Sequence, residues 1–144
     1  MRHLAPFIAA LVLACSAGAQ SDPGPNLQVI PPGDVTLQQG QTAEVSLPGG
    51  GPTALFIKFE RVVADSRCPS NVQCVWAGEV SVLLRLSGEA SGDRTLYLPG
   101  GTSGAATTDA GRYRIELKAV TPYPVSGATQ PEPHRVTLAI SLRP

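Results

Sequence analysis

The sequence lacks an excess of charge of either sign. Its 144 residues include 11 Lys and Arg against 11 Asp and Glu, and only 15% of them are charged. Because a nucleic-acid-binding chain needs a basic excess to neutralise phosphates, this balance argues against nucleic acid as a partner. A hydrophobic content of 42% is also too high for a disordered chain.

The sequence also lacks long apolar runs, and it is too short for two independent domains. Outside the N-terminal segment, no apolar run approaches the length of a membrane span. A chain of this length supports one hydrophobic core. The 15 Gly and 14 Pro disfavour long helices, so the composition predicts a turn-rich β fold.

Residues 1–19 are typical of a secretory signal peptide. A basic start at Arg2 and His3 is followed by an apolar stretch over residues 4–14 and by small residues up to Ala19. The apolar stretch is too short to span a bilayer stably. We therefore expect export to the periplasm or the extracellular space, with cleavage after Ala19.

Cys15 offers an alternative end to this segment. Residues 12–15 (VLAC) resemble a bacterial lipobox, in which the cysteine is lipidated and becomes the mature N-terminus. Ala14 fits that pattern, whereas Leu13 departs from it because a small residue is favoured there. Cleavage after Ala19 and lipidation at Cys15 both remain open, and a lipid at Cys15 is the only membrane attachment that we expect.

Alternating apolar and polar side chains follow a Pro- and Gly-rich tether at residues 20–34, which enters the domain near residues 27–30. This alternation predicts strands with one buried face. The alternating segments are 35–37, 42–47, 55–60, 80–86, 96–98, 112–119 and 135–142. Val62 and Val63 interrupt the pattern, which suggests a bulge or the end of a strand.

Half-apolar strands of this kind, roughly seven to eight of them, must bury one face against a partner sheet. Since no segment has the length and the 3.6-residue period of a crossover helix, we expect antiparallel pairing. The prediction for residues 35–144 is a single all-β domain, an antiparallel β-sandwich with an immunoglobulin-like topology. A small β-barrel is the alternative.

Cys68 and Cys74 are the two cysteines that follow the signal segment. Five intervening residues can turn back far enough for a disulfide, and exported cysteines are usually oxidised, so we predict this bond. A zinc site with His134 and a carboxylate is the alternative, but Cys-x5-Cys is not a usual ligand spacing. We expect no metal and no cofactor.

The segment around the cysteines is dense in residues with special backbone or binding properties. Pro69 fixes its own φ, and Gly78 permits a close backbone approach. Asp65 can accept backbone N–H groups in the turn or pair with Arg67. Trp76, the only tryptophan, would either shield the disulfide in a purely structural loop or be exposed as a binding anchor.

In the second case the loop between the cysteines would be a preorganised binding loop, which loses little entropy when it binds. Its candidate residues are Pro69, Ser70, Asn71, Val72, Gln73 and Trp76. A buried Trp76 would favour the structural role, and an exposed Trp76 would favour a binding surface.

The sequences DSRCP (residues 65–69) and CVWAGEV (residues 74–80) resemble a segment shared by a family of small exported bacterial proteins, many of them lipoproteins. The resemblance covers mainly residues 65–80, with looser similarity in the strand pattern and in residues 120–124. It implies an exported β fold and implies no activity.

Candidate catalytic residues are few. His134, the only histidine after the signal segment, would be the base of a hydrolase, but a lone histidine at a loop border is usually solvated. Gly-x-Ser-x-Gly and a phosphate-binding glycine loop are both missing from the sequence. Arg112, Arg114 and Lys118 share one strand face that could meet an anionic glycan or a lipid headgroup.

We therefore expect a non-enzymatic binding or structural module of the cell envelope, whose partner is a protein or a glycan. One alternative is a protein-ligand or inhibitor module that presents the Cys68–Cys74 loop. The other is a small hydrolase that uses His134.

Overall fold

The computed structural model describes residues 27–47, 53–99, 106–129 and 133–144. Within these ranges the chain forms strands connected by turns and loops, and it contains no helix long and apolar enough to cross a membrane. The strands are β1 (Leu27–Ile30), β2 (Asp34–Gln38), β3 (Thr42–Val45), β4 (Leu55–Asp65), β5 (Glu79–Gly88), β6 (Gly92–Pro99), β7 (Thr107–Ala110), β8 (Tyr113–Thr121) and β9 (Arg135–Leu142).

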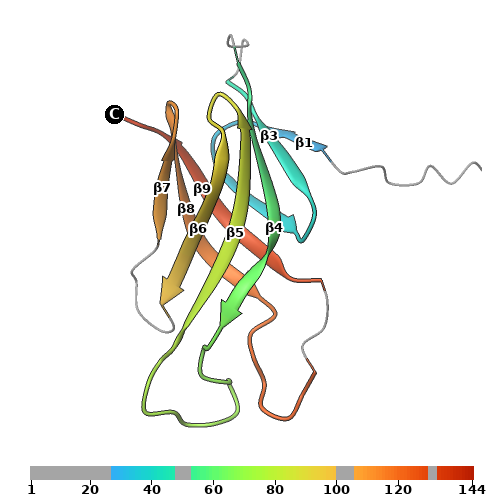
Figure 1. The fold of residues 1–144 in the computed structure, drawn as a ribbon, viewed down its shortest axis with the longest axis vertical. Coiled ribbons are helices and arrows are strands. Elements are labelled where there is room, and N and C mark those ends of the chain that lie inside the picture. Colours follow the sequence, from blue (N-terminus) through green and yellow to red (C-terminus); the bar gives the residue numbers. More distant parts are fainter. Residues whose placement is uncertain (1–26, 48–52, 100–105, 130–132) are drawn as a thin grey trace, which may run out of the picture.

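These strands form two sheets that pack face to face (Figure 1). One sheet has the order β1-β3-β4-β5-β6, and the other has the order β2-β9-β8-β7. The neighbours pair antiparallel, except that β1 runs parallel to β3. The predicted antiparallel β-sandwich is confirmed, and the sheets do not close into a barrel. Most neighbouring strands are consecutive hairpin partners, and within the described ranges the exceptions are the β1–β3 and β2–β9 pairs.

The core lies between the two sheets and is built by the alternation that the sequence displays. In β4 the side chains of Leu55, Ile57 and Phe59 are fully buried, and in β9 Val136 and Leu138 are fully buried. The residues between them point away from the core and are partly exposed. Because burial of one such side chain stabilises the fold by about 1.5–3 kcal/mol, this pattern fixes which face of each strand points inward.

β4 continues past the predicted segment as far as Asp65. Its register with β5 shifts between Phe59 and Arg61 and shifts again after Val62. The irregularity expected at Val62 and Val63 is therefore the second of two register shifts within one long strand and not its end. This length carries the loop that follows β4 to the lower end of the sandwich in Figure 1.

β1 lies inside the expected tether, at the point where the tether was expected to enter the domain. It pairs with β3, which in turn pairs with residues 55–58 at the start of β4. The expected signal segment, including Cys15 and the cleavage site at Ala19, lies outside the described residues.

Candidate functional site

The loop between β4 and β5, residues 66–78, is here called the cysteine loop. Cys68 and Cys74 are joined by a disulfide with a Cα–Cα distance of 5.8 Å, so the predicted bond is confirmed. At the base of the loop, Ser66 N–H donates to the Glu79 carbonyl at 2.8 Å, and Cys68 N–H donates to the Ala77 carbonyl at 3.1 Å. These hydrogen bonds extend the pairing of β4 and β5 into the loop and narrow its base.

Gly78 allows the two sides of this base to approach. Its φ is +68°, a left-handed conformation that side chains with a Cβ rarely adopt. A Cβ on Gly78 would lie 1.9 Å from the backbone oxygen of Ser66. The close backbone approach expected at Gly78 is therefore present, and only glycine fits there.

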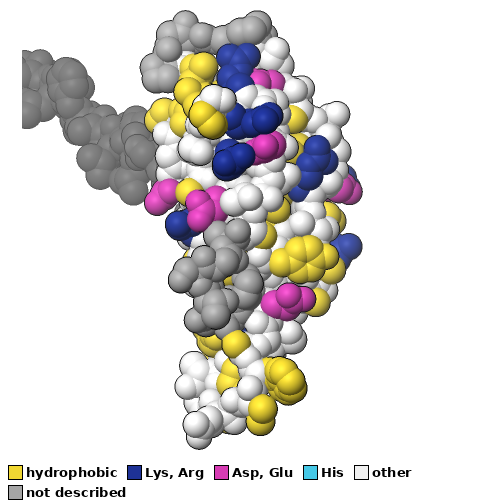
Figure 2. Space-filling model, turned by 90° about the vertical axis from the view of Figure 1, so that its left-hand side faces the viewer, with side chains coloured by type: hydrophobic (Ala, Val, Ile, Leu, Met, Phe, Trp, Pro, Cys, Tyr) yellow, Lys and Arg dark blue, Asp and Glu magenta, His cyan; other side chains and the backbone are white. Residues whose placement is uncertain are grey.

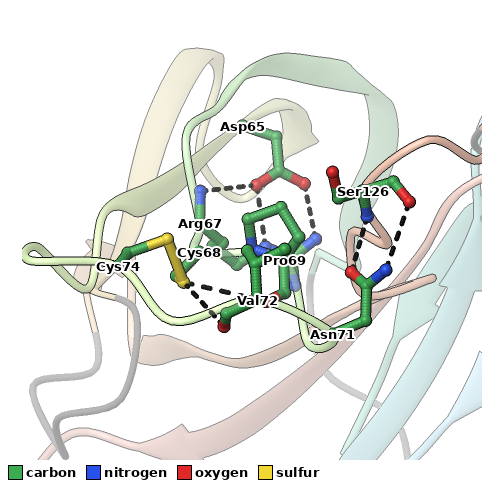
Figure 3. The surroundings of a disulfide bond; sticks show 8 residues. All are labelled: Asp65, Arg67, Cys68, Pro69, Asn71, Val72, Cys74 and Ser126. Atoms are coloured by element: carbon green, nitrogen blue, oxygen red, sulfur yellow. Dashed lines mark hydrogen bonds and ion pairs between the residues drawn. A yellow bond between two sulfur atoms is a disulfide. The ribbon is translucent and has the colours of Figure 1, made fainter.

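Asp65 and Arg67 form a two-pronged ion pair where β4 meets the cysteine loop (Figure 3). Arg67 donates from Nε to Asp65 Oδ1 at 2.8 Å and from Nη2 to Oδ2 at 2.5 Å. The Arg67 backbone N–H also donates to Oδ1, at 3.2 Å. Asp65 thus performs both roles expected of it, because it caps the turn and pairs with the arginine.

The Arg67 side chain is buried and reaches the end of β8 and the segment that follows it, residues 122–129, here called the β8–β9 loop. Its Nη1 donates to the Val120 carbonyl at 2.7 Å, and its Nη2 donates to the Pro122 carbonyl at 3.0 Å. The guanidinium carbon also lies 4.6 Å from the centre of the Tyr123 ring, a cation–π distance. Burying a charge is unfavourable unless the charge is paired and hydrogen-bonded, and both conditions are met here.

Asn71 and Ser70 add a second connection between the two loops (Figure 3). Asn71 Oδ1 accepts a hydrogen bond from Ser126 N–H at 2.7 Å, and Asn71 Nδ2 donates to the Ser126 carbonyl at 3.2 Å. Ser70 N–H donates to the Pro124 carbonyl at 2.9 Å. The side chain of Asn71 therefore holds the β8–β9 loop much as a paired strand would.

Residues 70–77 of the cysteine loop are exposed to solvent. Trp76 is 82% exposed and Val75 is 92% exposed, and Val72 is 46% exposed. Ser70, Asn71 and Gln73 are also exposed, while Pro69 is partly buried. Trp76 does not shield the disulfide, and its exposure is the outcome that favours a binding surface. In Figure 2, hydrophobic side chains are grouped at the lower tip, the end that carries both loops in Figure 1.

This tip has no charged residue in its sequence. Residues 68–78 and residues 119–129 contain no Asp, Glu, Lys or Arg. Arg67, which directly precedes residue 68, is buried and paired with Asp65. The β8–β9 loop was absent from the predicted site, because no sequence motif shows that two loops meet. Their shared lack of charge was the one signal in the sequence that connects them.

The other sequence candidates lie away from such an arrangement. His134 is partly buried just before β9, and its carbonyl accepts a hydrogen bond from Gln39 N–H at 2.8 Å. Throughout the described ranges, no three His, Cys, Asp or Glu side chains form a group that could hold a metal ion. The sulfurs of Cys68 and Cys74 are bonded to each other, so they are not thiolate ligands.

The basic residues along β8 are compensated by nearby acids. Arg114 pairs with Asp109 at 3.0 Å, and Lys118 pairs with Glu116 at 3.2 Å. The hydrogen bond from Arg114 lowers the pKa of Asp109 despite partial burial, and the nearby positive charges lower it further. This face therefore presents alternating charges and not the cationic surface that an anionic glycan or a lipid headgroup would need.

Comparison of the chain with protein-family models, with curated proteins and with solved structures found no match.

Proposed function

We propose that this chain is an exported, non-enzymatic β-sandwich of the cell envelope that binds a protein partner through the cysteine loop. The observation that carries the proposal is Trp76, which is 82% exposed on a loop held by a disulfide and by a buried ion pair. The disulfide is compatible with an oxidising compartment, as expected of an exported protein.

The energetics favour a binding role over a purely structural one. A tryptophan that served only to order the loop would gain most from burial against the disulfide or the sheets. Trp76 and Val75 instead leave their apolar surface in water. Tryptophan is also the residue type most enriched among the side chains that dominate protein–protein binding energy.

The bracing of the loop supports the same role. Side chains and loops that become ordered only on binding lose entropy, which weakens the complex. In the cysteine loop this ordering is present before any partner arrives, since Cys68, Arg67 and Asn71 each hold it by a different bond. Trp76 and Val75 are thus carried on a preorganised backbone.

A comparison of envelope proteins retained by immobilised domains tests the proposal. The domains are the wild type, Trp76→Ser and a control, Tyr97→Ser, which removes an aromatic ring that is 49% exposed on β6. We expect a protein that the wild type and the control retain equally, and that Trp76→Ser retains about tenfold less. Equal retention of that protein by all three domains would overturn the proposal. A fourth domain, in which residues 70–73 are replaced by Gly and Ser, should also retain less of it, and retention equal to that of the wild type would overturn the proposal as well.

Export is tested separately by the intact mass of the protein from the native envelope. We expect either a chain that begins at Gln20 or a chain that begins at a diacylated Cys15. A chain that still carries Met1 and is recovered from the cytosol would contradict the compartment.

A further inference from the structure

We infer that the binding surface is a composite of two loops, in which Tyr123 and Val125 of the β8–β9 loop contact the same partner as Val75 and Trp76. The inference rests on the proposed function. It assigns a binding role to the β8–β9 loop as well as to the cysteine loop. The partner is a protein that contacts both loops through an uncharged, apolar cleft.

The two loops are joined along their length. Backbone carbonyls of alternate residues in the second segment accept hydrogen bonds from the cysteine loop, as one edge of an extended strand would. The accepting residues are Val120, Pro122, Pro124 and Ser126. These four contacts, which come from Arg67, Ser70 and Asn71, fix the position of residues 120–126 relative to the cysteine loop.

This docking leaves apolar side chains of the second loop in water. Tyr123 is 44% exposed although its ring lies against the Arg67 guanidinium, and Val125 is 41% exposed. Together with Val72, Val75 and Trp76 they make up most of the large exposed hydrophobic residues of the described ranges, and all five are on these two loops. Apolar side chains that gather at one end of a domain mark an interaction site.

The absence of charged residues from the two loop segments indicates what kind of partner they bind. The centre of a protein–protein interface is depleted of charged residues and enriched in Trp and Tyr, which matches residues 68–78 and 119–129. An anionic membrane or a nucleic acid would select Lys and Arg, which both segments lack. The loops project from the sandwich (Figure 1), so their convex tip fits a concave surface.

The experiment is photo-crosslinking in the native cells with p-benzoylphenylalanine placed singly at position 75, 125 or 142. Position 142 is the control, because Leu142 is 50% exposed but pairs with Tyr113 at the far end of β8. Each variant is also made with Trp76→Ser. We expect positions 75 and 125 to give adducts with the same protein, and position 142 to give none. Trp76→Ser should weaken both adducts about tenfold.

The alternative outcomes separate the two proposals. An adduct from position 75 alone would overturn the composite surface and leave the proposed function standing. No adduct from position 75 would overturn both. An adduct of twice the chain's own mass, or binding of the domain to phosphatidylcholine vesicles that Trp76→Ser abolishes, would replace the protein cleft by a second copy or by a lipid surface.

Discussion

Arg67 lies two residues after Asp65 and donates hydrogen bonds to its carboxylate from two side-chain nitrogens. The same guanidinium donates to the carbonyls of Val120 and Pro122, more than fifty residues further along the chain. The arginine side chain is only 3% exposed and that of Asp65 is 17% exposed. One buried cation therefore ties the end of β4 to the β8–β9 loop, and the position of the candidate binding surface depends on this pair.

Asp65→Asn should lower the free energy of unfolding by about 3 kcal/mol, because it leaves the buried Arg67 charge without its counter-ion. Urea unfolding measures the loss. The matched control is Asp93→Asn, which breaks an ion pair with Arg85 in which both side chains are at least half exposed. That change should cost far less, because solvent-exposed ion pairs contribute little to stability. Equal effects of the two substitutions would show that Arg67 does not depend on Asp65.

Gly78→Ala should destabilise the domain by about 2 kcal/mol or more, since the new Cβ combines a left-handed backbone with a collision against the Ser66 carbonyl. Gly127→Ala is the control, because Gly127 also has a positive φ, +79°, but a Cβ added there would meet nothing within 4 Å beyond its chain neighbours. The control should lose about 1 kcal/mol. Similar midpoints for both variants in thermal unfolding would contradict the close approach at Gly78.

Replacement of Cys68 and Cys74 together by serine should lower the free energy of unfolding by about 2 kcal/mol, because the closed loop is short. The domain should remain folded, since the disulfide lies outside the main core and Asn71 still holds the loop to Ser126. Circular dichroism and urea unfolding of the oxidised wild type and the double variant measure this. Loss of the β spectrum would instead show that the disulfide supports the whole sandwich.

The strands with a buried face could be predicted from the sequence because burial repeats at every second residue. Leu55, Ile57 and Phe59 are an example, since the spacing of these three residues alone determines which face of β4 is apolar. β7 was not predicted. Its four residues, TTDA, contain a single buried side chain, Ala110, and its pairing with β8 supplies the order that its own pattern lacks.

The local part of the candidate site could be predicted from the sequence, whereas the contact between its two loops could not. The disulfide follows from the local spacing between Cys68 and Cys74. The exposure of Trp76 does not follow from the sequence, which is compatible with both a buried and an exposed tryptophan. The contact between Asn71 and Ser126 joins residues 55 positions apart in the chain. The shared lack of charge hints that the two loops belong together, but no periodic pattern encodes this particular contact, because it depends on which strands become neighbours at that end of the sandwich.

Glu89 and Arg112 connect the two sheets at their other end, since Glu89 follows β5 and Arg112 precedes β8. Glu89 accepts from the Arg112 backbone N–H at 2.7 Å and from Nε at 2.9 Å. Burial of the Glu89 carboxylate acts to raise its pKa, but the two hydrogen bonds and the charge of Arg112 outweigh burial, so the pKa is lowered. The ionised form is thus favoured by folding.

A pKa that is lower in the folded chain stabilises the fold above the unfolded value, about 4.3, and this stabilisation is lost as the pH falls through the folded pKa. Glu89→Gln should therefore destabilise the domain near neutral pH, and its difference from the wild type should shrink as the pH falls below the unfolded value. Urea unfolding across this range measures the difference. In an Arg112→Gln background, Glu89→Gln should lose this pH dependence. Parallel curves for wild type and Glu89→Gln throughout the range would show that the pair does not connect the sheets through charge.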